Sequence, residues 1–328
     1  MAIQARTEFA AALNQVSAEH GITAEIVLES IKVAILAAYK KDYGEVEAEN
    51  INVDINSATG EVKMLQNGKD TTPAGFGRIA AQTAKQVIIQ RIREAEKQSI
   101  LSEFAQKIGT IVSAIVLRIS GPLVIINLGK TEGILPPVEQ IPGETYTSGQ
   151  RLKFLIKDIR TGQNKEEIVL SRSDPRLVVK LFEMEVPEVG ARTVEIKTIA
   201  REPGKRTKIA VFSDKPGVDP VGSCVGQKGV RVNAVNSEVG SEKIDVIAYS
   251  PEIEQFIISA LQPATGIKVK YDKKQNTAKV KLPADQLSLA IGAGGVNVRL
   301  AARLTGVKID IAEGDKKAGE DKERTKTE

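Results

Sequence analysis

Apolar residues in the first third of the chain mostly recur every three or four positions, which is the spacing of an amphipathic helix. The pattern predicts two helices near the start, with inward faces made of Phe9, Leu13 and Val16 in the first and of Ile26, Ile31, Ala34 and Ala38, near Leu28 and Ile35, in the second. A third, longer helix is predicted from near Phe76 to about Lys107. Its apolar stripe consists of Ala80, Ala84, Val87, Ile88, Ile92 and Ala95.

Between the second and third helices the period shortens to two, as in a half-buried strand. Ile51, Val53 and Ile55 alternate with polar residues, and turn residues 57–60 lead to a second strand around Met64. We therefore expect residues 1–107 to form a helical α+β domain. The polar face of its long helix carries six basic and three acidic residues, which fits either a solvated face or a docking surface for an acidic partner: Arg78, Lys85, Arg91, Arg93, Lys97, Lys107, Glu94, Glu96 and Glu103.

Residues 108–174 change to short β-rich runs separated by glycine and proline. Five such runs follow one another with no helical period between them, at residues 110–118, 123–127, 133–135, 152–159 and 167–172. Five short strands in so short a segment fit a small closed barrel of the oligonucleotide-binding (OB) type.

From Asp174 onward helices and strands alternate, and the pattern occurs twice. The stretch at residues 221–232 matches that at residues 287–298, so that the spacing Gly-x-x-Gly recurs 66 residues further on. Strand segments also match, residues 208–211 with 279–282 and residues 243–246 with 308–311. Each copy predicts the order helix, strand, strand, helix, Gly-x-x-Gly, helix, strand. We expect two related domains, at residues 175–250 and 251–312, and hence a multidomain α+β protein.

The recurring Gly-x-x-Gly turn between two helices suits contact with phosphate. Glycine has no Cβ, so the backbone can come close to a bulky ligand. The helix after the turn begins with N–H groups that lack partners and with a partial positive charge. We assign a clamp for single-stranded RNA to two sets of residues. They are Gly226, Gln227, Lys228 and Gly229 with Arg231 beside them, and Gly292, Ala293, Gly294 and Gly295 with Arg299 and Arg303 supplying the positive charge.

Two familiar glycine-rich motifs do not fit these loops. A dinucleotide-binding fingerprint needs Gly-x-Gly-x-x-Gly after a strand, but residues 292–297 end in asparagine and follow a predicted helix. A Walker phosphate loop needs Gly-Lys followed by Ser or Thr, which residues 226–229 do not supply. A plain tight turn between helices would explain one copy, whereas two copies in matching contexts favour ligand binding.

Composition narrows the chemistry further. The chain has 328 residues, which favours several domains, and its net charge of +4 is too small to indicate nucleic acid by itself. The single cysteine, Cys224, excludes an internal disulfide. The single histidine, His20, lies in a predicted turn between helices. One cysteine and one histidine so far apart in the sequence cannot form a zinc site and do not suggest a Cys/His nucleophile pair. No carboxylate cluster has metal-ligand spacing, so we expect no enzyme, no metal and no cofactor.

No stretch approaches the roughly 20 apolar residues of a membrane span. The N-terminus has an early Glu8 and no apolar core, unlike a signal peptide. We therefore expect a cytoplasmic monomer without membrane contact. Residues 313–328 hold six acidic and five basic residues without an apolar period, which predicts a disordered tail.

These segments together resemble a known family. The second half resembles two tandem type II (prokaryotic) KH domains, and the order of helical domain, five-stranded barrel, KH and KH resembles the NusA family of bacterial transcription elongation and termination factors. The stretches that carry the resemblance lie at residues 76–88, 173–178, 186–190, 201–206 and 219–226.

The resemblance implies a non-enzymatic, RNA-binding transcription factor. The N-terminal domain would bind RNA polymerase near the RNA exit channel, and the other three domains would hold nascent single-stranded RNA. The protein would then modulate pausing, termination and antitermination, with other elongation or antitermination factors as further partners. For the polymerase contact we expect the cations of the long helix, Arg78, Lys85, Arg91 and Arg93.

The barrel is expected to contribute less to RNA binding. OB folds grip single strands largely by stacking bases on aromatic rings. Between residues 109 and 173 only Tyr146 and Phe154 are aromatic, and Phe154 alternates with its neighbours as a core position does. Any RNA contact must then come mainly from charge, which we assign to Lys153 and Lys157.

Two other functional classes remain open at this point. Phosphorolytic RNA-degrading enzymes also carry KH and barrel modules, but usually with KH before the barrel and with a catalytic core that no segment here supplies. A cofactor of such an enzyme, or a ribosome-associated protein, is the other alternative. Co-purification with polymerase, with degradation enzymes or with ribosomal subunits would separate these classes.

Overall fold

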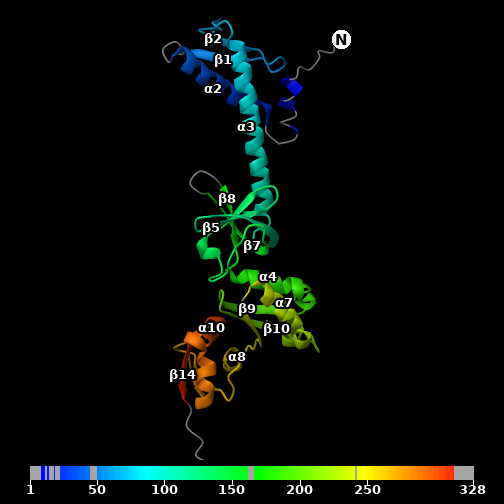
Figure 1. Cartoon of the computed structure of the whole chain (residues 1–328), viewed down its shortest axis with the longest axis vertical. Coiled ribbons are helices and arrows are strands. Elements are labelled where there is room, and N and C mark those ends of the chain that lie inside the picture. Colours follow the sequence, from blue (N-terminus) through cyan, green and yellow to red (C-terminus); the bar gives the residue numbers. More distant parts are fainter. Residues whose placement is uncertain are drawn as a thin grey trace, which may run out of the picture. The chain divides into compact units, whose positions relative to one another are not determined.

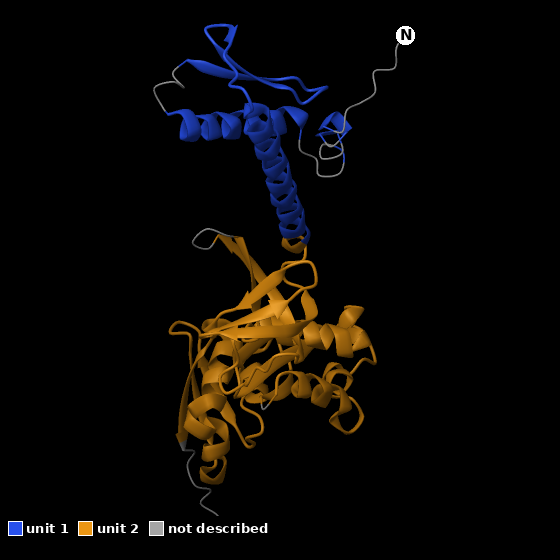
Figure 2. Cartoon of the chain, turned by 45° about the horizontal axis from the view of Figure 1, so that its top comes forward, with its two compact units in different colours: residues 1–103 blue, residues 104–328 orange. Residues whose placement is uncertain are grey.

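The computed structural model describes residues 9–11, 13–14, 18, 23–44, 50–161, 166–240 and 242–313. The chain divides into two units, residues 1–103 (unit 1) and residues 104–328 (unit 2), shown in different colours in Figure 2. The predictions for Val16, for a turn at His20 and for a disordered tail beyond Glu313 fall outside the described residues.

Unit 1 builds one core from helices and a small antiparallel sheet (Figure 1). Its elements are α2 (Ala24–Tyr43), β1 (Ile51–Ile55), β2 (Val62–Gln66), β3 (Lys69–Asp70) and α3 (Phe76–Ala105). The predicted alternation in β1 is confirmed, since its residues are buried and exposed in turn. The predicted stripe of α3 is also confirmed, with Ala80 and Ala84 buried and Val87, Ile88 and Ile92 packed against the core.

The predicted inward face of α2 was partly wrong. The buried residues are Val27, Ile31, Ile35 and Tyr39, a strict four-residue spacing, whereas Ile26 is 54% exposed. The ring of Tyr39 packs edge-on against Phe76 of α3, with 5.6 Å between ring centroids. The contact between these two rings sets the rotation of α2 about its axis, so that Ile26 points to solvent.

Unit 2 begins with a closed five-stranded barrel, as the sequence predicted. Its strands are β4 (Ile111–Ser120), β5 (Leu123–Asn127), β6 (Glu132–Leu135), β7 (Arg151–Thr161) and β8 (Glu166–Ser171), with a 3-10 turn, η1 (Pro137–Glu139), after β6. The strand order is β4-β5-β6-β8-β7, and β7 pairs back to β4 to close the ring. The β6–β8 pair is parallel and the others are antiparallel. Phe154 is completely buried inside it.

Two similar α+β parts follow the barrel, and we call them the first and second repeat. The first consists of α4 (Pro175–Glu185), α5 (Pro187–Gly190), β9 (Glu195–Glu202), β10 (Arg206–Phe212), α6 (Pro220–Val225), η2 (Gln227–Gly229), α7 (Val230–Glu238) and β11 (Lys243–Ala248). The second consists of α8 (Ile253–Ala260), β12 (Lys268–Asp272), β13 (Thr277–Leu282), η3 (Ala284–Gln286), α9 (Leu287–Ile291), η4 (Ala293–Gly295), α10 (Val296–Thr305) and β14 (Lys308–Glu313).

The two repeats have the same sheet topology, which confirms the internal repeat. In the first, β10 lies between antiparallel β9 and parallel β11. In the second, β13 lies between antiparallel β12 and parallel β14. The register agrees as well, because Lys208 lies opposite Asp245 and the matching Lys279 lies opposite Asp310.

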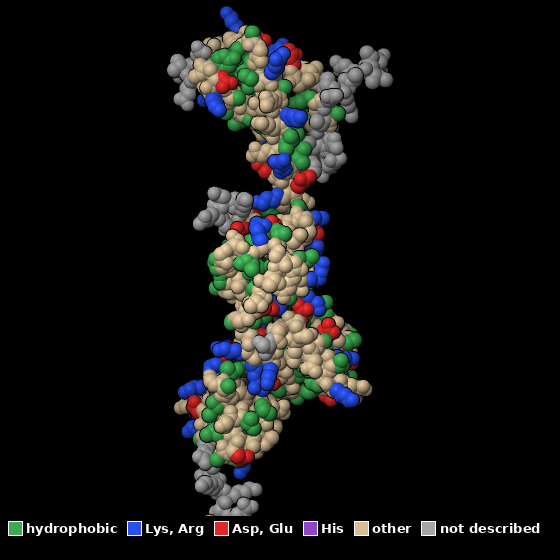
Figure 3. All heavy atoms as spheres, in the orientation of Figure 1, with side chains coloured by type: hydrophobic (Ala, Val, Ile, Leu, Met, Phe, Trp, Pro, Cys, Tyr) green, Lys and Arg blue, Asp and Glu red, His purple; other side chains and the backbone are tan. Residues whose placement is uncertain are grey.

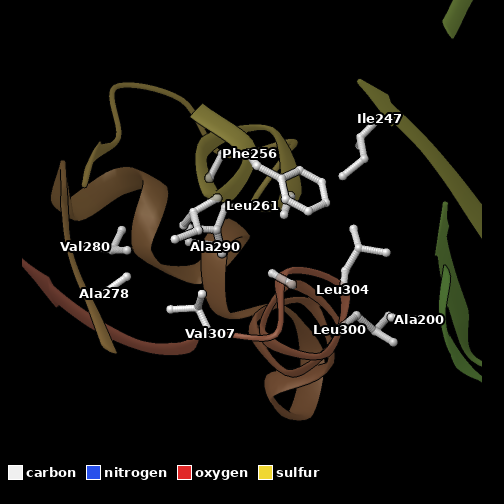
Figure 4. Close-up of a cluster of buried hydrophobic side chains, with 14 of the residues drawn as sticks. Ala200, Ile247, Phe256, Leu261, Ala278, Val280, Ala290, Leu300, Leu304 and Val307 are labelled. Atoms are coloured by element: carbon white, nitrogen blue, oxygen red, sulfur yellow. The ribbon is translucent and has the colours of Figure 1, made fainter. Parts of the chain in front are cut away.

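The repeats share one hydrophobic core. Ala200, Ala210 and Ile247 on the sheet of the first repeat belong to the same buried cluster as Phe256 of α8 and Leu300 of α10 (Figure 4). Helices of the second repeat thus cover the outward face of the first repeat's sheet, and small alanine side chains on that face let them approach. Burial of this kind contributes roughly 25 cal/mol per Å² of apolar surface.

A buried lysine completes this junction. The Nζ atom of Lys208, whose side chain is fully buried, donates to the Gln262 carbonyl at 3.0 Å and lies 3.0 Å from the Asp245 carboxylate. Burial lowers the pKa of Lys208, and Asp245 acts in the opposite direction. A buried ammonium is tolerated only when it is paired and hydrogen-bonded, so this contact fixes how the repeats meet.

The barrel and the first repeat are joined by another buried cation, Arg172. Its guanidinium donates to both carboxylate oxygens of Glu144 in the barrel, and at 2.7 Å each to the carbonyls of Lys153 and of Glu238 at the end of α7. It also lies 5.8 Å from the ring centroid of Phe154. One side chain therefore ties two neighbouring parts of the barrel to the end of α7, which lies 66 residues further along the chain.

We predict that Arg172→Ala lowers the free energy of unfolding of unit 2 by about 3–5 kcal/mol, because it leaves a carboxylate and two carbonyls without their buried partner. Urea denaturation of the full chain, followed by circular dichroism, measures this change. Arg118→Ala removes an exposed ion pair with Glu132 and is the matched control, for which we expect no measurable change. Equal midpoints for both variants would contradict the prediction.

Candidate nucleic-acid interface

The first Gly-x-x-Gly loop is set up by the helix before it. Asp219 caps α6 by accepting the Val221 N–H at 3.1 Å, and Pro220 occupies the first helical position. The helix ends at Gly226, whose N–H donates to the Gly222 carbonyl at 2.8 Å. At φ 74° and ψ 172°, Gly226 adopts a backbone conformation that only glycine reaches readily.

The second loop has the same backbone. Gly292 has φ 73° and ψ 169°, and its N–H donates to the Ser288 carbonyl at 2.8 Å. The closing residues Gly229 and Gly295 are both left-handed, at φ 76° and ψ 15° and at φ 72° and ψ 17°. The two loops therefore have the same backbone conformation although their two middle residues differ. This conformation requires the outer glycines.

The third loop position is left-handed in both copies but carries different residues. Lys228 has φ 52° and ψ 25°, and Gly294 has φ 57° and ψ 24°. A left-handed backbone costs a residue with a Cβ roughly 1–2 kcal/mol. Lys228 is thus held in a strained conformation that glycine would adopt freely, and such strain is typical of functional positions.

Both loops present their middle residues to solvent at the start of a helix. Gln227, Lys228, Ala293 and Gly294 are exposed. Neither α7 nor α10 has a side-chain cap at its N-terminus. Their first N–H groups are engaged within the turn, because Val230 donates to the Gln227 carbonyl and Val296 to the Ala293 carbonyl. Each helix therefore offers an anion the partial positive charge of its N-terminus. Beside the first loop lies a groove of about 700 Å³, lined by Glu188, Gly222, Gly226, Gln227, Val230 and Arg231.

Apolar side chains flank the loops. Val230 is 63% exposed and Ile291 is 37% exposed. Exposed aliphatic residues beside the start of a helix can contact the faces of unstacked bases while the positive helix end attracts phosphate. The loops can thus accept single-stranded nucleic acid without any aromatic ring.

Arg231 is held within the protein. It donates to both carboxylate oxygens of Glu188 on α5, at 3.2 and 3.0 Å, and to the Ser223 carbonyl at 2.6 Å. The matching residue in the second repeat, Asn297, is buried and donates to the matching carbonyl of Leu289 at 3.1 Å. Both side chains therefore tie the helix after the loop to the helix before it.

Arg299 and Arg303 meet the first repeat. Arg299 donates to both carboxylate oxygens of Glu202 at 3.0 Å each, and Arg303 lies 3.6 Å from the same carboxylate. The hydrogen bond from Arg299 lowers the pKa of Glu202. Arg299 also donates to the Gly294 carbonyl and so supports the second loop. Arg299 therefore lies at the loop and shares its charge with Glu202, while Arg303 lies beside the same acid.

The barrel lysines are engaged too. The backbone N–H of Lys153 donates to Glu238 at 3.0 Å, and its ammonium lies 3.6 Å from the same carboxylate. Lys157 donates to the buried Glu139. The structure does not bring either lysine to the Gly-x-x-Gly loops of the repeats.

The barrel aromatics cannot stack on bases, because both rings are buried. Phe154 is fully buried and Tyr146 is 8% exposed. The Tyr146 hydroxyl donates to Glu144 at 2.6 Å and accepts the Ile141 N–H at 3.2 Å, and burial raises the pKa of this phenol well above its usual range. The expectation that Phe154 is a core residue is confirmed.

The cations of α3 do not form one face. Arg78, Lys85 and Arg93 are exposed. Arg91 instead turns toward α2, where its guanidinium donates to the Ser30 hydroxyl at 2.8 and 3.0 Å and pairs with Glu94. It lines a groove of about 440 Å³ between α2 and α3, together with Ser30, Val33, Ala34, Ala37 and Val87.

Other chemistries find little support. Within the described residues no three His, Cys, Asp or Glu side chains are grouped so that they could hold a metal ion. Cys224 is buried, and burial raises its pKa to about 11, which leaves the thiol unreactive near neutral pH. Among the helices of the described ranges, none has the length and apolar character needed to span a membrane.

Comparisons with known proteins agree along the chain. The family model of the NusA N-terminal domain matches residues 8–69 and 69–98, that of the NusA-like first KH domain matches residues 172–249, and that of the NusA-like second KH domain matches residues 253–318. These models match the helical unit and the two repeats.

Whole-chain relatives give the same result. The transcription termination/antitermination protein NusA of Bacillus subtilis is 40% identical over 337 residues, which cover 93% of this chain and 90% of the relative. The protein of that name from Mycobacterium tuberculosis is 42% identical over 318 residues, covering 92% of each. That of Halalkalibacterium halodurans is 39% identical over 337 residues, covering 93% and 88%.

Exchanging lysine and glycine between the two loops at the third position separates the effect of backbone strain on stability from the effect of charge on RNA binding. We predict that Lys228→Gly raises the free energy of unfolding by up to about 1 kcal/mol, because relief of left-handed strain exceeds the entropic cost of glycine. Gly294→Lys, whose Cβ would meet open space, should lower it by a similar amount. Denaturation midpoints of both variants test this.

The variants Lys228→Gly and Gly294→Lys should change RNA affinity in the direction opposite to their change in stability. Loss of the Lys228 charge is expected to weaken single-stranded RNA binding severalfold, whereas Gly294→Lys should strengthen it. Fluorescence polarisation with a labelled oligonucleotide measures both. Unchanged affinity in both variants would remove the third loop position from the interface.

Proposed function

Since this chain belongs to the NusA family of transcription termination/antitermination proteins, we propose that it holds single-stranded nascent RNA on its two Gly-x-x-Gly loops while its N-terminal part binds RNA polymerase. The family consists of transcription factors and not of enzymes. We propose four functional parts: residues 1–107 for polymerase, 108–174 as the barrel, and 175–250 and 251–312 as the RNA-binding repeats.

The observation that carries this proposal is the identical backbone of the two loops. Each turns through a glycine at φ near 74° into a helix without a side-chain cap. The partial positive charge at the start of α7 and α10 can then attract phosphate, with no Cβ in the way at the outer loop positions. A loop of this type clamps about four nucleotides.

The rigid junction between the repeats favours one continuous RNA track. Both repeats contribute to one apolar cluster, and Lys208 is bonded across the junction to the Gln262 carbonyl. Two clamps at a fixed spacing bind one strand more tightly than either alone, because the second contact is intramolecular. The strand should therefore cover about eight nucleotides or more.

The cations take different parts in this scheme. Lys228 is the exposed cation of the first loop and contacts phosphate directly. Arg231 acts as a positioning residue, because Glu188 and Ser223 hold it across the base of the loop. Arg299 and Arg303 pair with Glu202, so they can bind phosphate at the second loop only if they divide their charge between phosphate and Glu202 or release Glu202. RNA binding and the junction between the repeats are therefore coupled.

The barrel supports the repeats more than it grips RNA. Lys153 and Lys157 would have to leave Glu238 and Glu139 in order to bind phosphate. Contact with Glu238, at the end of α7, instead fixes the helix that begins at the first loop. We therefore propose that the barrel orients the first repeat.

Unit 1 offers two surfaces to polymerase. One is the exposed cation group of α3, Arg78, Lys85 and Arg93, which suits an acidic partner surface. The other is the groove between α2 and α3, where Val33 is 62% exposed. Polymerase bound to one part of the chain raises the local concentration of its transcript at the loops, which is how a tethered clamp can alter pausing and termination.

Acidic substitutions at the middle loop positions test RNA binding while keeping the required glycines. We predict that Gln227→Asp with Lys228→Asp weakens binding of a 12-nucleotide single strand about tenfold or more, because carboxylates repel phosphate. Ala293→Asp with Gly294→Asp should act similarly, and the four changes together should abolish measurable binding. Gly226 and Gly292 are unsuitable sites, because a Cβ there would be strained and at Gly292 would lie 3.0 Å from the Asn297 backbone nitrogen.

A control of the same residue types lies in the β12–β13 turn. Lys274→Asp with Gln275→Asp makes the same change in charge at exposed positions, and we expect it to leave single-strand affinity unchanged. Fluorescence polarisation, with thermal unfolding to confirm the fold, gives both results. Equal losses for loop and control variants would show that only net charge matters, which the proposal does not allow.

For polymerase, we predict that Arg78→Glu, Lys85→Glu and Arg93→Glu together weaken binding about tenfold while single-stranded RNA affinity is retained. The triple variant Lys32→Glu, Lys40→Glu and Lys41→Glu on α2 carries the same change in charge and serves as the control. Co-sedimentation with polymerase, together with a transcription assay on a hairpin-pause template, measures the effect. If the α3 variant still bound polymerase and Val33→Glu did not, the polymerase contact would lie in the groove between α2 and α3 and not at the cations.

A further inference from the structure

The groove beside the first loop is lined by polar and charged side chains. It measures about 700 Å³, and its lining residues come from α5, α6, α7 and the segment before α6. The polar ones are Glu188, Asp219, Ser223, Gln227 and Arg231. Figure 3 shows acidic and basic side chains intermingled on the face of the molecule drawn over α4 and α7. A ligand in this groove is therefore selected by its pattern of hydrogen-bond donors and acceptors and not by net charge alone.

Arg231 is fixed in one orientation in this groove. Its Nη1 atom makes three hydrogen bonds, two to the carboxylate oxygens of Glu188 and one to the Ser223 carbonyl. Its aliphatic stem passes so close to Gly226 that a Cβ there would lie 2.9 Å from the Arg231 Cγ. The Nε and Nη2 atoms make no hydrogen bond with any residue that the structure describes. The guanidinium thus keeps two adjacent donors for a ligand, in addition to holding the loop.

Glu188 keeps the capacity to accept further hydrogen bonds. Its side chain is 35% exposed. A hydrogen bond from its own backbone N–H, together with the one from Arg231, lowers the pKa of Glu188, so the carboxylate is charged near neutral pH. An ionised carboxylate has about four lone-pair positions, and Arg231 occupies one on each oxygen. Two donors of Arg231 and two acceptors of Glu188 are therefore offered next to one another.

This pattern matches guanine among the four RNA bases. Guanine presents two neighbouring acceptors, N7 and O6, followed by two neighbouring donors, N1–H and the amino group. The donor pair of an arginine binds O6 and N7, and a carboxylate can accept from the other two positions. Adenine and cytosine each present one amino group beside acceptors, and uracil turns two carbonyl oxygens toward a carboxylate. Only guanine satisfies both side chains.

The walls of the groove leave room for a flat ring. Three glycines line it, Gly217, Gly222 and Gly226, and main chain without a Cβ lets a ring lie close to it. Val230 also lines the groove and is 63% exposed, which supplies an apolar surface for the face of a base. A nucleotide whose phosphate meets the exposed Lys228 can therefore place its base in the groove.

The second repeat has no corresponding pair of side chains. The positions that match Ser223 and Arg231 are occupied by Leu289 and Asn297, of which Leu289 is 46% exposed and Asn297 is buried. Between α8 and β12 the described residues contain no helix that corresponds to α5, which carries Glu188. The second loop thus has apolar neighbours that suit any base, whereas the first has a pair that distinguishes between bases.

We propose that the groove beside the first loop selects guanine, with Glu188 accepting from N1–H and the amino group and with Arg231 donating to O6 and N7. The inference rests on the proposed binding of single-stranded RNA and adds a base preference at one of the two loops. A guanine ring could come from the strand or from a free nucleotide, and the adjoining phosphate-binding loop favours the strand. One guanine then fixes the register of the strand, and the second loop holds the bases that follow.

Changes of base in the RNA test this without any change in the protein. The full chain is titrated into labelled 12-nucleotide strands of uridine that carry one guanine at successive positions, and fluorescence polarisation measures the affinity. At the position that reaches the groove, guanine should bind about tenfold more tightly than adenine, cytosine or uracil. Inosine keeps O6, N7 and N1–H but lacks the amino group, so it should lose most of this gain. Equal affinity for guanine and adenine at every position, or for guanine and inosine, overturns the proposal.

The variant Glu188→Gln tests the role of the carboxylate. It should abolish the preference for guanine, and also the difference between guanine and inosine, without loss of affinity for the all-uridine strand. Glu183→Gln is the matched control and should keep the preference, because Glu183 lies in the same repeat, pairs with Lys180 and is 36% exposed. Thermal unfolding confirms the fold of both variants. If Glu188→Gln weakened all strands equally, the carboxylate would only support Arg231, and the proposed base preference would be refuted.

Competition with guanosine monophosphate distinguishes the strand from a free nucleotide. We expect no displacement of the labelled strand, because the free nucleotide lacks the neighbouring phosphates that the loop attracts. Displacement that is lost in Glu188→Gln would assign the groove to a free nucleotide and overturn the proposal. Strands that bind through both loops without any base preference refute this inference alone. Failure of every strand to bind refutes the proposed RNA binding together with it.

Discussion

The left-handed backbone of the Gly-x-x-Gly loops is the constraint on which the rest of the structure depends. Gly226 and Gly292 lie at φ values near 74° with extended ψ, a region that other residues hardly enter. This bend ends one helix and aims the N-terminus of the next at solvent. If the chain could not turn there, neither the positive end of the next helix nor the exposed middle positions would lie where phosphate can reach them.

Around these loops the protein uses buried charge to fix the parts of unit 2 relative to one another. Arg172 joins the barrel to α7, and Lys208 joins the two repeats. Glu202 pairs with Arg299 across the same junction. Such pairs add little net stability compared with apolar packing, but breaking one is costly, so they favour one geometry over others. A fixed geometry is what two clamps need if they are to hold one strand.

Much of the fold could be predicted from the sequence because it is encoded locally. A period-two pattern located β1, and β-rich runs separated by glycine and proline located the barrel strands. Glycines 66 residues apart identified the internal repeat. The rotation of α2 was missed in part, since it depends on Tyr39 meeting Phe76. The two-residue strand β3 is too short to show any period.

The partners of the site cations could not be found in this way. Arg231 pairs with Glu188, Lys153 with Glu238 and Arg299 with Glu202, over separations of 43, 85 and 97 residues that no local pattern encodes. One clue was present, however. The repeats exchange arginine and asparagine between matching positions, Arg231 with Asn297 and Asn233 with Arg299, which signals that these residues serve different contacts in each copy.

The most direct measurement of the central claim is the response of individual backbone N–H groups to RNA. In the isotope-labelled full chain, titration with a single-stranded RNA of about 12 nucleotides should shift the amide resonances of residues 227–231 and 293–297 together and most strongly. The β12–β13 turn should stay unchanged. Shifts that leave both loops untouched, or that gather on the barrel, would show that RNA is held elsewhere.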